Sequence, residues 1–172
     1  MNPYTATEKQ RLRKRWTRDL INHIVIALNE GEPITELISA VDVPRGLDEL
    51  SGRMDFRGID FSHQNLRGPW KTGKKGRCRS GISLINADFS CADLSWVILP
   101  HADLQGGIFT DADLSYAELI SSDLSGADLT GAVMQGVWLL DTKLCDALVT
   151  EEQLQSRQNR GQMDFDYRAY IR

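Results

Sequence analysis

The chain has few of the residues that mark secreted or membrane proteins. It contains 3 cysteines in 172 residues, and a small odd number favours a reducing compartment, so we expect a cytoplasmic protein. No apolar run is long enough to cross a membrane, and the charged stretch Glu8–Arg18 follows the N-terminus directly. We therefore expect neither a signal peptide nor a membrane partner.

Patterns typical of catalytic and metal sites are also missing from the sequence. The 3 histidines are scattered, and no Cys-x-x-Cys or His-Glu-x-x-His spacing occurs. The segment Gly68–Lys75 approaches the phosphate-binding pattern G-x-x-x-x-G-K-[ST], but Lys75 stands where a hydroxyl group would ligate magnesium. We expect no enzyme activity, no cofactor and no metal site.

What the sequence does contain is a five-residue period. From Leu84 to Val149 every fifth residue is Leu, Phe, Met or Val, which makes fourteen consecutive units in phase. A helix repeats its apolar residues at about 3.6 and a strand at about 2, so only a coil with several equivalent sides keeps this register. In such a coil the central residue and the small residue two before it point into a narrow lumen.

The units share the form Ala-Asp-Leu-x-x, as in Ala102–Gly106 and Ala127–Gly131. This run closely resembles the pentapeptide-repeat family, whose members fold as a right-handed quadrilateral β-helix with one pentapeptide on each side. The resemblance also extends to Met54–Arg67. It implies a mainly β fold in which residues 54–149 form the coil. In this frame Cys91 and Cys145 face outward on different sides, and we expect no disulfide between them.

Helical segments are expected to cap both ends of the coil, because its end rungs would otherwise be open. Residues 1–53 predict one helix over about 5–29, which begins with a capping box at Thr5–Glu8, and a second over about 33–41. Residues 150–172 predict a cap helix and an aromatic tail. In that helix Leu154 would plug the last rung.

The five-residue phase slips once. Leu66 and Leu84 are 18 residues apart, so the segment from about 69 to 81 must leave the coil, with either 13 or 8 inserted residues. The sequence predicts a projecting basic loop, and projecting loops of solenoids often carry function. Its candidate binding residues are Trp70, Lys71, Lys74, Lys75, Arg77 and Arg79.

The charges of the chain are separated. Residues 84–149 hold ten acids and one base, a net charge of −9, against −4 for the whole chain. About 3.5 turns at ~4.8 Å give a rod of about 17 Å, or one net charge per ~1.9 Å, close to the ~1.7 Å of duplex DNA. The candidate acidic faces carry Asp88, Asp93, Asp103, Asp111, Asp113, Asp123 and Asp128.

One side of the coil differs from the other three. If Leu84 defines side one, side four is centred on Leu99, Leu119 and Leu139, and its outward positions are apolar and aromatic. A contiguous apolar patch usually marks something that covers it. We favour the first helix or the C-terminal tail as the cover, with a second copy or a partner protein as the alternatives. The candidate docking residues are Trp96, Ile98, Tyr116, Ile120, Trp138 and Leu140.

Three functions agree with these patterns. The first is a non-enzymatic protein-protein interaction module or scaffold. The second, which the family resemblance also implies, is a DNA mimic that binds a type II topoisomerase such as DNA gyrase, as an inhibitor or in quinolone protection. The third is direct nucleic-acid binding through the basic loop and the first helix, which the acidic body disfavours.

Overall fold

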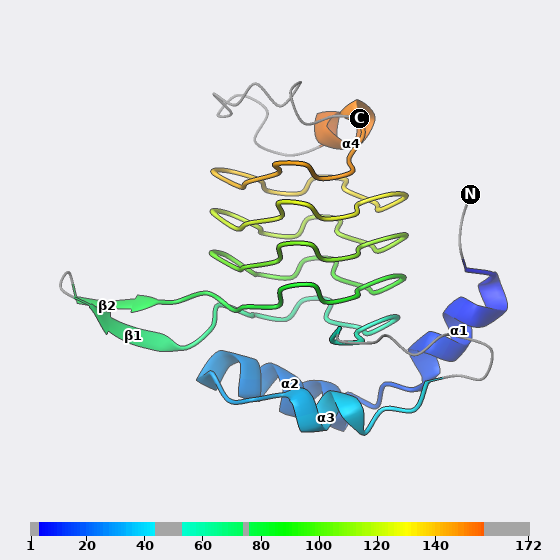
Figure 1. Ribbon diagram of the computed structural model, residues 1–172, viewed down its shortest axis with the longest axis horizontal. Helices are drawn as coiled ribbons and strands as arrows, with labels where there is room; N and C mark the ends of the chain where they lie inside the picture. The colour runs from blue at the N-terminus through cyan, green and yellow to red at the C-terminus, as the bar shows by residue number, and fades with distance from the viewer. Residues whose placement is uncertain (1–3, 44–52, 74–75, 157–172) are drawn as a thin grey trace.

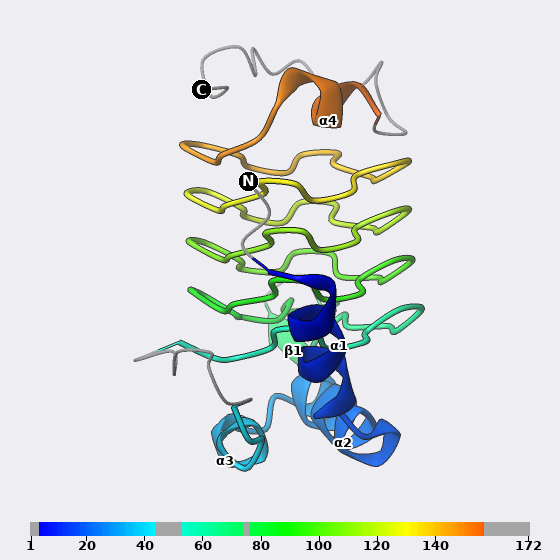
Figure 2. The same ribbon diagram turned by 90° about the vertical axis from the view of Figure 1, so that its right-hand side faces the viewer.

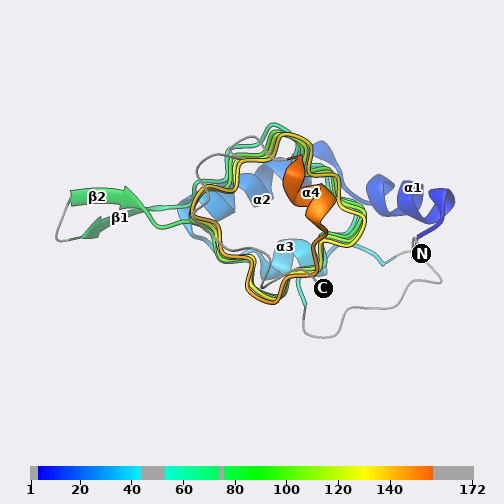
Figure 3. The same cartoon turned by 90° about the horizontal axis from the view of Figure 1, so that it is seen from above.

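Residues 4–43, 53–73 and 76–156 are described by the computed structural model, and they form a stacked coil with helices at both ends (Figure 1). Isolated parallel bridges join residues 20 positions apart, from Ser83–Asp103 to Asp128–Leu148. Four five-residue units therefore make one turn, and the turns superpose on a four-sided outline when they are viewed along the axis (Figure 3). This geometry agrees with the predicted four-sided coil, and each side contributes a single bridge to each neighbouring turn.

The lumen is filled by two residues from each side, as the period predicts. Central residues such as Leu104 and small residues such as Ala102 are both at most 1% exposed. Ser122 and Thr142 are polar residues at small positions, and their hydroxyls donate to the carbonyls of Leu99 (2.9 Å) and Leu119 (2.6 Å). Because these hydroxyls are hydrogen-bonded, they occupy the lumen without an unpaired polar group.

A column of aromatic rings joins the first turns of the coil to the helical cap. Phe56, Phe89 and Phe109 stack with centroids 4.9 and 5.2 Å apart. Trp16, from the cap, stacks on Phe56 at 6.3 Å. The column therefore continues the coil's core into the N-terminal cap.

The prediction of one N-terminal helix over 5–29 is wrong. Two helices are present, α1 (Ala6–Lys14) and α2 (Arg18–Glu30), and the Thr17 side chain caps the second. The chain breaks here because Trp16 turns toward the coil, where its indole N–H donates to the Arg57 carbonyl at 2.9 Å. Consequently α2 lies beneath the first turn while α1 stands beside the stack (Figure 1).

The remaining helices are short. Helix α3 (Thr35–Ser39) covers less than the predicted 33–41, and α4 (Glu151–Gln155) closes the other end of the coil. Leu154 is 1% exposed, so its predicted role as a plug is confirmed, as are the capping boxes at Thr5 and Thr150. The predicted aromatic tail lies outside the described residues. Within the described ranges, no helix has both the length and the apolar character needed to cross a membrane.

The inserted segment is a β-hairpin, where a loop was predicted. Strands β1 (Trp70–Gly73) and β2 (Gly76–Arg79) pair in antiparallel register and project from the first turn (Figure 1). Bridges across the insertion, such as Asp55–Asp88, join residues 33 positions apart instead of 20. The insertion therefore adds 13 residues, the longer of the two predicted lengths.

The hairpin begins and ends at two glycines with left-handed backbones, Gly68 (φ 73) and Gly81 (φ 71). A Cβ on Gly68 would meet the Gly81 carbonyl oxygen at 2.3 Å, and a Cβ on Gly81 would meet that of His101 at 1.9 Å. These contacts exclude any other residue from either position. The two glycines also leave the hairpin joined to the coil at a single corner.

We expect that deletion of residues 69–81 leaves a folded coil. The deletion joins Gly68 to Ile82, which restores the five-residue step from Leu66 to Leu84. The free energy of unfolding should change by less than about 2 kcal/mol, since a long surface insertion adds little net stability. Chemical denaturation followed by circular dichroism measures this change.

Deletion of residues 69–83 is the matched control, because it moves Leu84 out of its place in the lumen. This variant should lose several times more stability than the first. Equal losses in the two deletions would show that the hairpin does not interrupt an otherwise regular coil.

Candidate functional site

Two aromatic residues stand at corners of the coil where their backbone conformation is unfavourable. One residue at each corner has a positive φ, and these residues include Trp96 (φ 59) and Tyr116 (φ 60). Glycine, asparagine and aspartate tolerate this region best, whereas bulky side chains there are uncommon. A bulky side chain at such a corner therefore strains the local backbone. Backbone strain of this kind is often found at functional sites.

The aromatic corner residues form a continuous stack along the coil axis. His63 lies over Trp96 with ring centroids 6.0 Å apart, and Trp96 lies over Tyr116 at 4.4 Å. Despite this stacking, Trp96 remains 50% exposed. We name His63, Trp96 and Tyr116 the aromatic ladder.

Side four adjoins the aromatic ladder. Ile98, Glu118 and Trp138 occupy equivalent outward positions in consecutive turns, because parallel bridges join each of them to the next. Trp138 is 43% exposed, and Ile120 and Leu140 are half-buried. The structure therefore brings all six predicted docking residues together on one side and its adjoining corner.

The first helix does not cover side four, contrary to one of the two covers that we favoured from sequence; the other, the C-terminal tail, lies outside the described residues. Helix α1 lies against the corner between sides two and three, where Lys9 pairs with Asp111 (3.4 Å) and Leu12 packs against Gly58. Helix α2 lies beneath the first turn (Figure 2). The apolar stripe of the predicted single helix is divided at Arg15–Thr17, and its buried residues Ile21, Ile24 and Leu28 belong to α2.

The aspartates that precede the central residues have a structural role first. Their Oδ1 atoms accept hydrogen bonds from the backbone N–H two residues later, as in Asp93 to Ser95 (3.0 Å) and Asp113 to Ser115 (2.8 Å). Asp103, Asp123 and Asp128 repeat this contact. The regular acidic pattern of the sequence thus follows from the need to hold each turn.

The acidic surface is smaller than the sequence suggests. Asp88 is 3% exposed, Asp111 pairs with Lys9 under α1, and Asp123 pairs with Lys143 at 3.0 Å. Asp93, Asp103, Asp113 and Asp128 remain partly exposed without an ion pair among the described residues. The seven candidate carboxylates therefore do not form one continuous charged face.

The hairpin carries an exposed cation–aromatic pair. Trp70 is 53% exposed, and the Arg79 guanidinium lies 4.4 Å from the centre of its ring while donating to the Gly68 carbonyl at 2.6 Å. Lys71 is exposed. Arg77 belongs to β2, but its side chain lies outside the described part of the structure, as do Lys74 and Lys75 altogether.

Cys91 is buried, so the prediction from the repeat frame that it faces outward to solvent is wrong. It is 1% exposed because α1 covers its corner, and burial raises the pKa of its thiol to about 11. Cys91 and Cys145 are both free, in agreement with the expectation that they do not pair. Among the described residues, no group of three or more His, Cys, Asp or Glu side chains could hold a metal ion.

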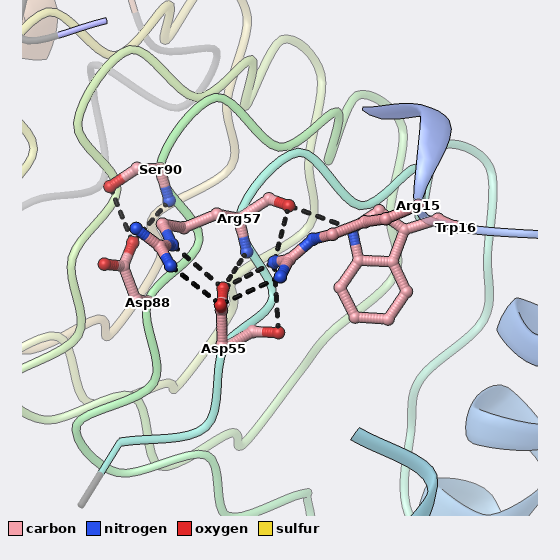
Figure 4. Close-up of polar contacts among 6 residues, drawn as sticks. All are labelled: Arg15, Trp16, Asp55, Arg57, Asp88 and Ser90. Carbon is pink, nitrogen blue, oxygen red and sulfur yellow. Dashed lines mark hydrogen bonds and ion pairs between the residues drawn. The ribbon is translucent and has the colours of Figure 1, made fainter. Parts of the chain in front are cut away.

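A buried ion cluster at the first turn was missed from sequence. Asp55 accepts hydrogen bonds from Arg15 (Nη1 to Oδ2, 2.9 Å) and from Arg57 (Nε to Oδ1, 3.0 Å), as Figure 4 shows. The side chains of the two arginines are only 5% and 3% exposed. The one available signal was Arg57. It directly follows the central residue Phe56, at a position where most units carry Ser, Thr or another small residue.

This cluster fixes the junction of α1 and α2 to the coil. Burial by itself would raise the pKa of Asp55, but the hydrogen bonds from Arg57 and Arg15 outweigh it and lower that pKa to about 2. Trp16 contributes the neutral contact to the Arg57 carbonyl. The junction is therefore held by charge and by an aromatic side chain at the same place.

These features define a class of protein: a solenoid whose repeats build the core and leave their outward residues for contacts. The family model described as pentapeptide repeats matches residues 80–106 and 108–144 in eight copies. Over these residues the chain carries the repeats of the pentapeptide-repeat family. The family fold is a right-handed quadrilateral β-helix, and its members are generally non-enzymatic structural or interaction modules.

Solved structures of this family resemble the chain. HetL, involved in heterocyst differentiation regulation in the cyanobacterium Nostoc sp. strain PCC 7120, is 30% identical over 56% of this chain and 41% of HetL, with a TM-score of 0.46. The pentapeptide repeat protein alr5209 from Nostoc PCC 7120 is 29% identical over 71% of this chain and 86% of alr5209, with a TM-score of 0.49.

A third structure is QnrB1, a plasmid-mediated fluoroquinolone resistance protein, which is 24% identical over 56% of this chain and 44% of QnrB1, with a TM-score of 0.44. The chain thus spans less than half the length of HetL and of QnrB1. The comparison with curated proteins finds no match.

The ion cluster predicts a specific loss of stability in acid. The folded-state pKa of Asp55, about 2, lies below its ordinary value of 3.8, so its contribution is complete above about pH 4 and is lost as pH falls toward 2. The loss should be about 2 kcal/mol in the free energy of unfolding. Asp55→Asn should remove this pH dependence, and at neutral pH it should cost about 3–5 kcal/mol because two buried cations lose their partner.

Urea denaturation between pH 2 and pH 6 tests this prediction. Asp60→Asn, which removes an exposed carboxyl from the same turn, is the matched control and should keep the wild-type loss. If Asp55→Asn retained the full loss below pH 4, the acid sensitivity would arise elsewhere in the chain.

Proposed function

We propose that this protein is a non-enzymatic binding module that docks a partner protein on side four and the aromatic ladder. The observation that carries the proposal is the group of exposed apolar side chains there, with Trp96 50% and Trp138 43% exposed. Exposed apolar patches on folded proteins usually mark interaction sites, and tryptophan and tyrosine often dominate binding energy.

The backbone supports the same surface. Trp96 and Tyr116 occupy positions with φ near +60°, where a smaller residue would fold with less strain. Gly106 and Gly126 fill the equivalent place at another corner. Retention of large rings at strained corners supports a role in contacts beyond the coil.

The partner should combine apolar anchors with a basic rim. Glu118 lies within side four, and Asp93 and Asp113 lie on side three across the aromatic ladder. A coil segment with a net charge of −9 speeds association with a cationic surface and disfavours an acidic one. A cytoplasmic partner is part of the proposal, in keeping with the low cysteine content.

DNA mimicry toward a type II topoisomerase is the second candidate. Asp60, Asp93 and Asp113 lie in one column of consecutive turns, since parallel bridges join each to the next. No ion pair to them is found among the described residues. These three carboxylates follow one another at the spacing of adjacent strands, about 4.8 Å. Such a row of negative charges supports DNA mimicry by side three only.

We expect a photo-crosslinker at Leu140, on side four, to capture a protein in the source cell. Ile120→Ser combined with Trp138→Ser should reduce the adduct at least about tenfold, because apolar anchors commonly contribute more than 1 kcal/mol each. A crosslinker at Val133, which is 51% exposed on side three, is the matched control and should give no adduct.

The mass of the adduct identifies the occupant. An adduct of twice the chain mass would mean a second copy in place of a partner protein. Equal adducts from Leu140 and Val133, or none from Leu140, would remove side four as the docking surface.

The mimicry candidate predicts an effect on DNA gyrase. Micromolar protein should inhibit supercoiling or preserve it in the presence of a quinolone, and Asp93→Asn with Asp113→Asn should weaken that effect. Asp141→Asn, an exposed acid at another corner, should not. An unchanged supercoiling reaction with the wild-type protein would exclude this candidate.

A further inference from the structure

Helix α1 is a basic segment bound to the outside of the coil. It lies at the corner formed by residues 57–58, 90–91 and 110–111, which we name the strap corner, opposite the corner that carries the hairpin (Figure 3). Its sequence between Lys9 and Lys14 holds four cations and no acid. The corner beneath it contributes Asp111, whose Oδ2 is buried and accepts no hydrogen bond.

Two side chains hold α1 against the strap corner. Leu12 is 0% exposed, and it packs so closely on Gly58 that a Cβ there would lie 2.7 Å from its own Cβ. The Lys9 ammonium lies 3.4 Å from Asp111 Oδ2. No other residue of α1 is buried, so the helix itself is fastened by one apolar anchor and one ion pair, while Tyr4, just before it, hydrogen-bonds the Arg57 side chain.

The C-terminal end of α1 is fastened separately. Arg15 and Trp16 bind Asp55 and Arg57 at the first turn. The strap can therefore leave its corner without detaching the α1–α2 junction. The described residues that it covers include Cys91, which is 1% exposed and carries a free thiol.

We infer that the strap corner is a docking site for a basic helix with a leucine anchor, which α1 occupies within the same chain and yields to a partner segment of that chemistry. The bound α1 itself specifies the ligand: a cation three residues before a leucine, so that both side chains share one helix face. The small residue Gly58 admits the leucine, and the otherwise unpaired Asp111 oxygen requires the cation. This site is separate from side four and does not depend on it.

Exchange between α1 and a partner follows from competition for one site. A segment that binds only when α1 has left has an apparent affinity reduced by the fraction of open molecules. Substitutions that loosen α1 should therefore strengthen binding of an intact external helix. Salt screens the Lys9–Asp111 ion pair, so higher salt should also increase the fraction of molecules in which α1 has left the strap corner.

Labelling of Cys91 with a maleimide in the full chain measures opening. Cys78→Ser with Cys145→Ser leaves Cys91 as the one reactive thiol. Leu12→Ala should raise the labelling rate at least about thirtyfold, as expected for loss of a buried leucine anchor, and Lys9→Gln should raise it about threefold to fivefold. Lys14→Gln, which removes an exposed cation from the same helix, is the matched control and should change the rate less than about twofold.

A second labelling measurement separates opening from unfolding. In a Cys78→Ser, Cys91→Ser background, Leu12→Ala should leave the labelling rate of Cys145 unchanged. Faster labelling of Cys145 would mean that the whole coil loosens, and this would overturn the inference. An unchanged Cys91 rate in Leu12→Ala would overturn it as well.

A fluorescent peptide with the sequence of residues 4–17 tests the docking site directly. It should bind the Leu12→Ala chain at least about tenfold more tightly than the wild-type chain, because the internal competitor is weakened. The same peptide carrying Leu12→Ala should bind neither chain. Equal binding of the two peptides would overturn the inference that the strap corner recognises a leucine-anchored basic helix.

Discussion

The narrow lumen is the constraint on which the rest of the structure depends. Each side supplies one large apolar residue and one small residue two positions earlier, and both are buried. Hydrogen bonds link successive turns, as between the Leu84 amide and the Asp103 carbonyl at 2.8 Å. Each central side chain contributes roughly 1.5 to 3 kcal/mol. Added residues must therefore leave the coil entirely, because a change of spacing within it would remove all later residues from their places at once.

This constraint leaves the corners as places where further segments can join the coil. An insertion of 13 residues enters at the corner between sides four and one, and α1 lies on the diagonally opposite corner (Figure 3). Neither addition interrupts the stacking, because the turns on either side keep their parallel bridges. The features most suited to recognition therefore lie at corners and on side four, while the core remains uniform.

The ends of the coil need contacts that the repeat does not provide. At the first turn, Trp16 continues the stack of phenylalanine rings and Asp55 lies between two arginines. At the last turn, Leu154 plugs the lumen and Gln153 donates to the carbonyls of Leu129 and Ala132. Both ends combine an apolar plug with polar groups that satisfy exposed backbone atoms, as repeat folds require of their caps.

The sequence by itself determined the coil, because one unbroken period assigns every residue between Leu84 and Val149 to the lumen, a side or a corner. It also located the side-four residues, the insertion and both capping boxes. These features depend on spacing along the chain, which a sequence displays directly. A binding function also requires a partner, and spacing along the chain does not specify which one.

Only the tertiary structure decided which surfaces are available. It divided the predicted helix at Trp16, placed α1 over Cys91 and Asp111, and buried Asp88. It also joined Arg15 to Asp55, residues 40 positions apart. Contacts of this kind depend on how the non-repeating helices dock on the coil, and no period relates those helices to the turns that they touch.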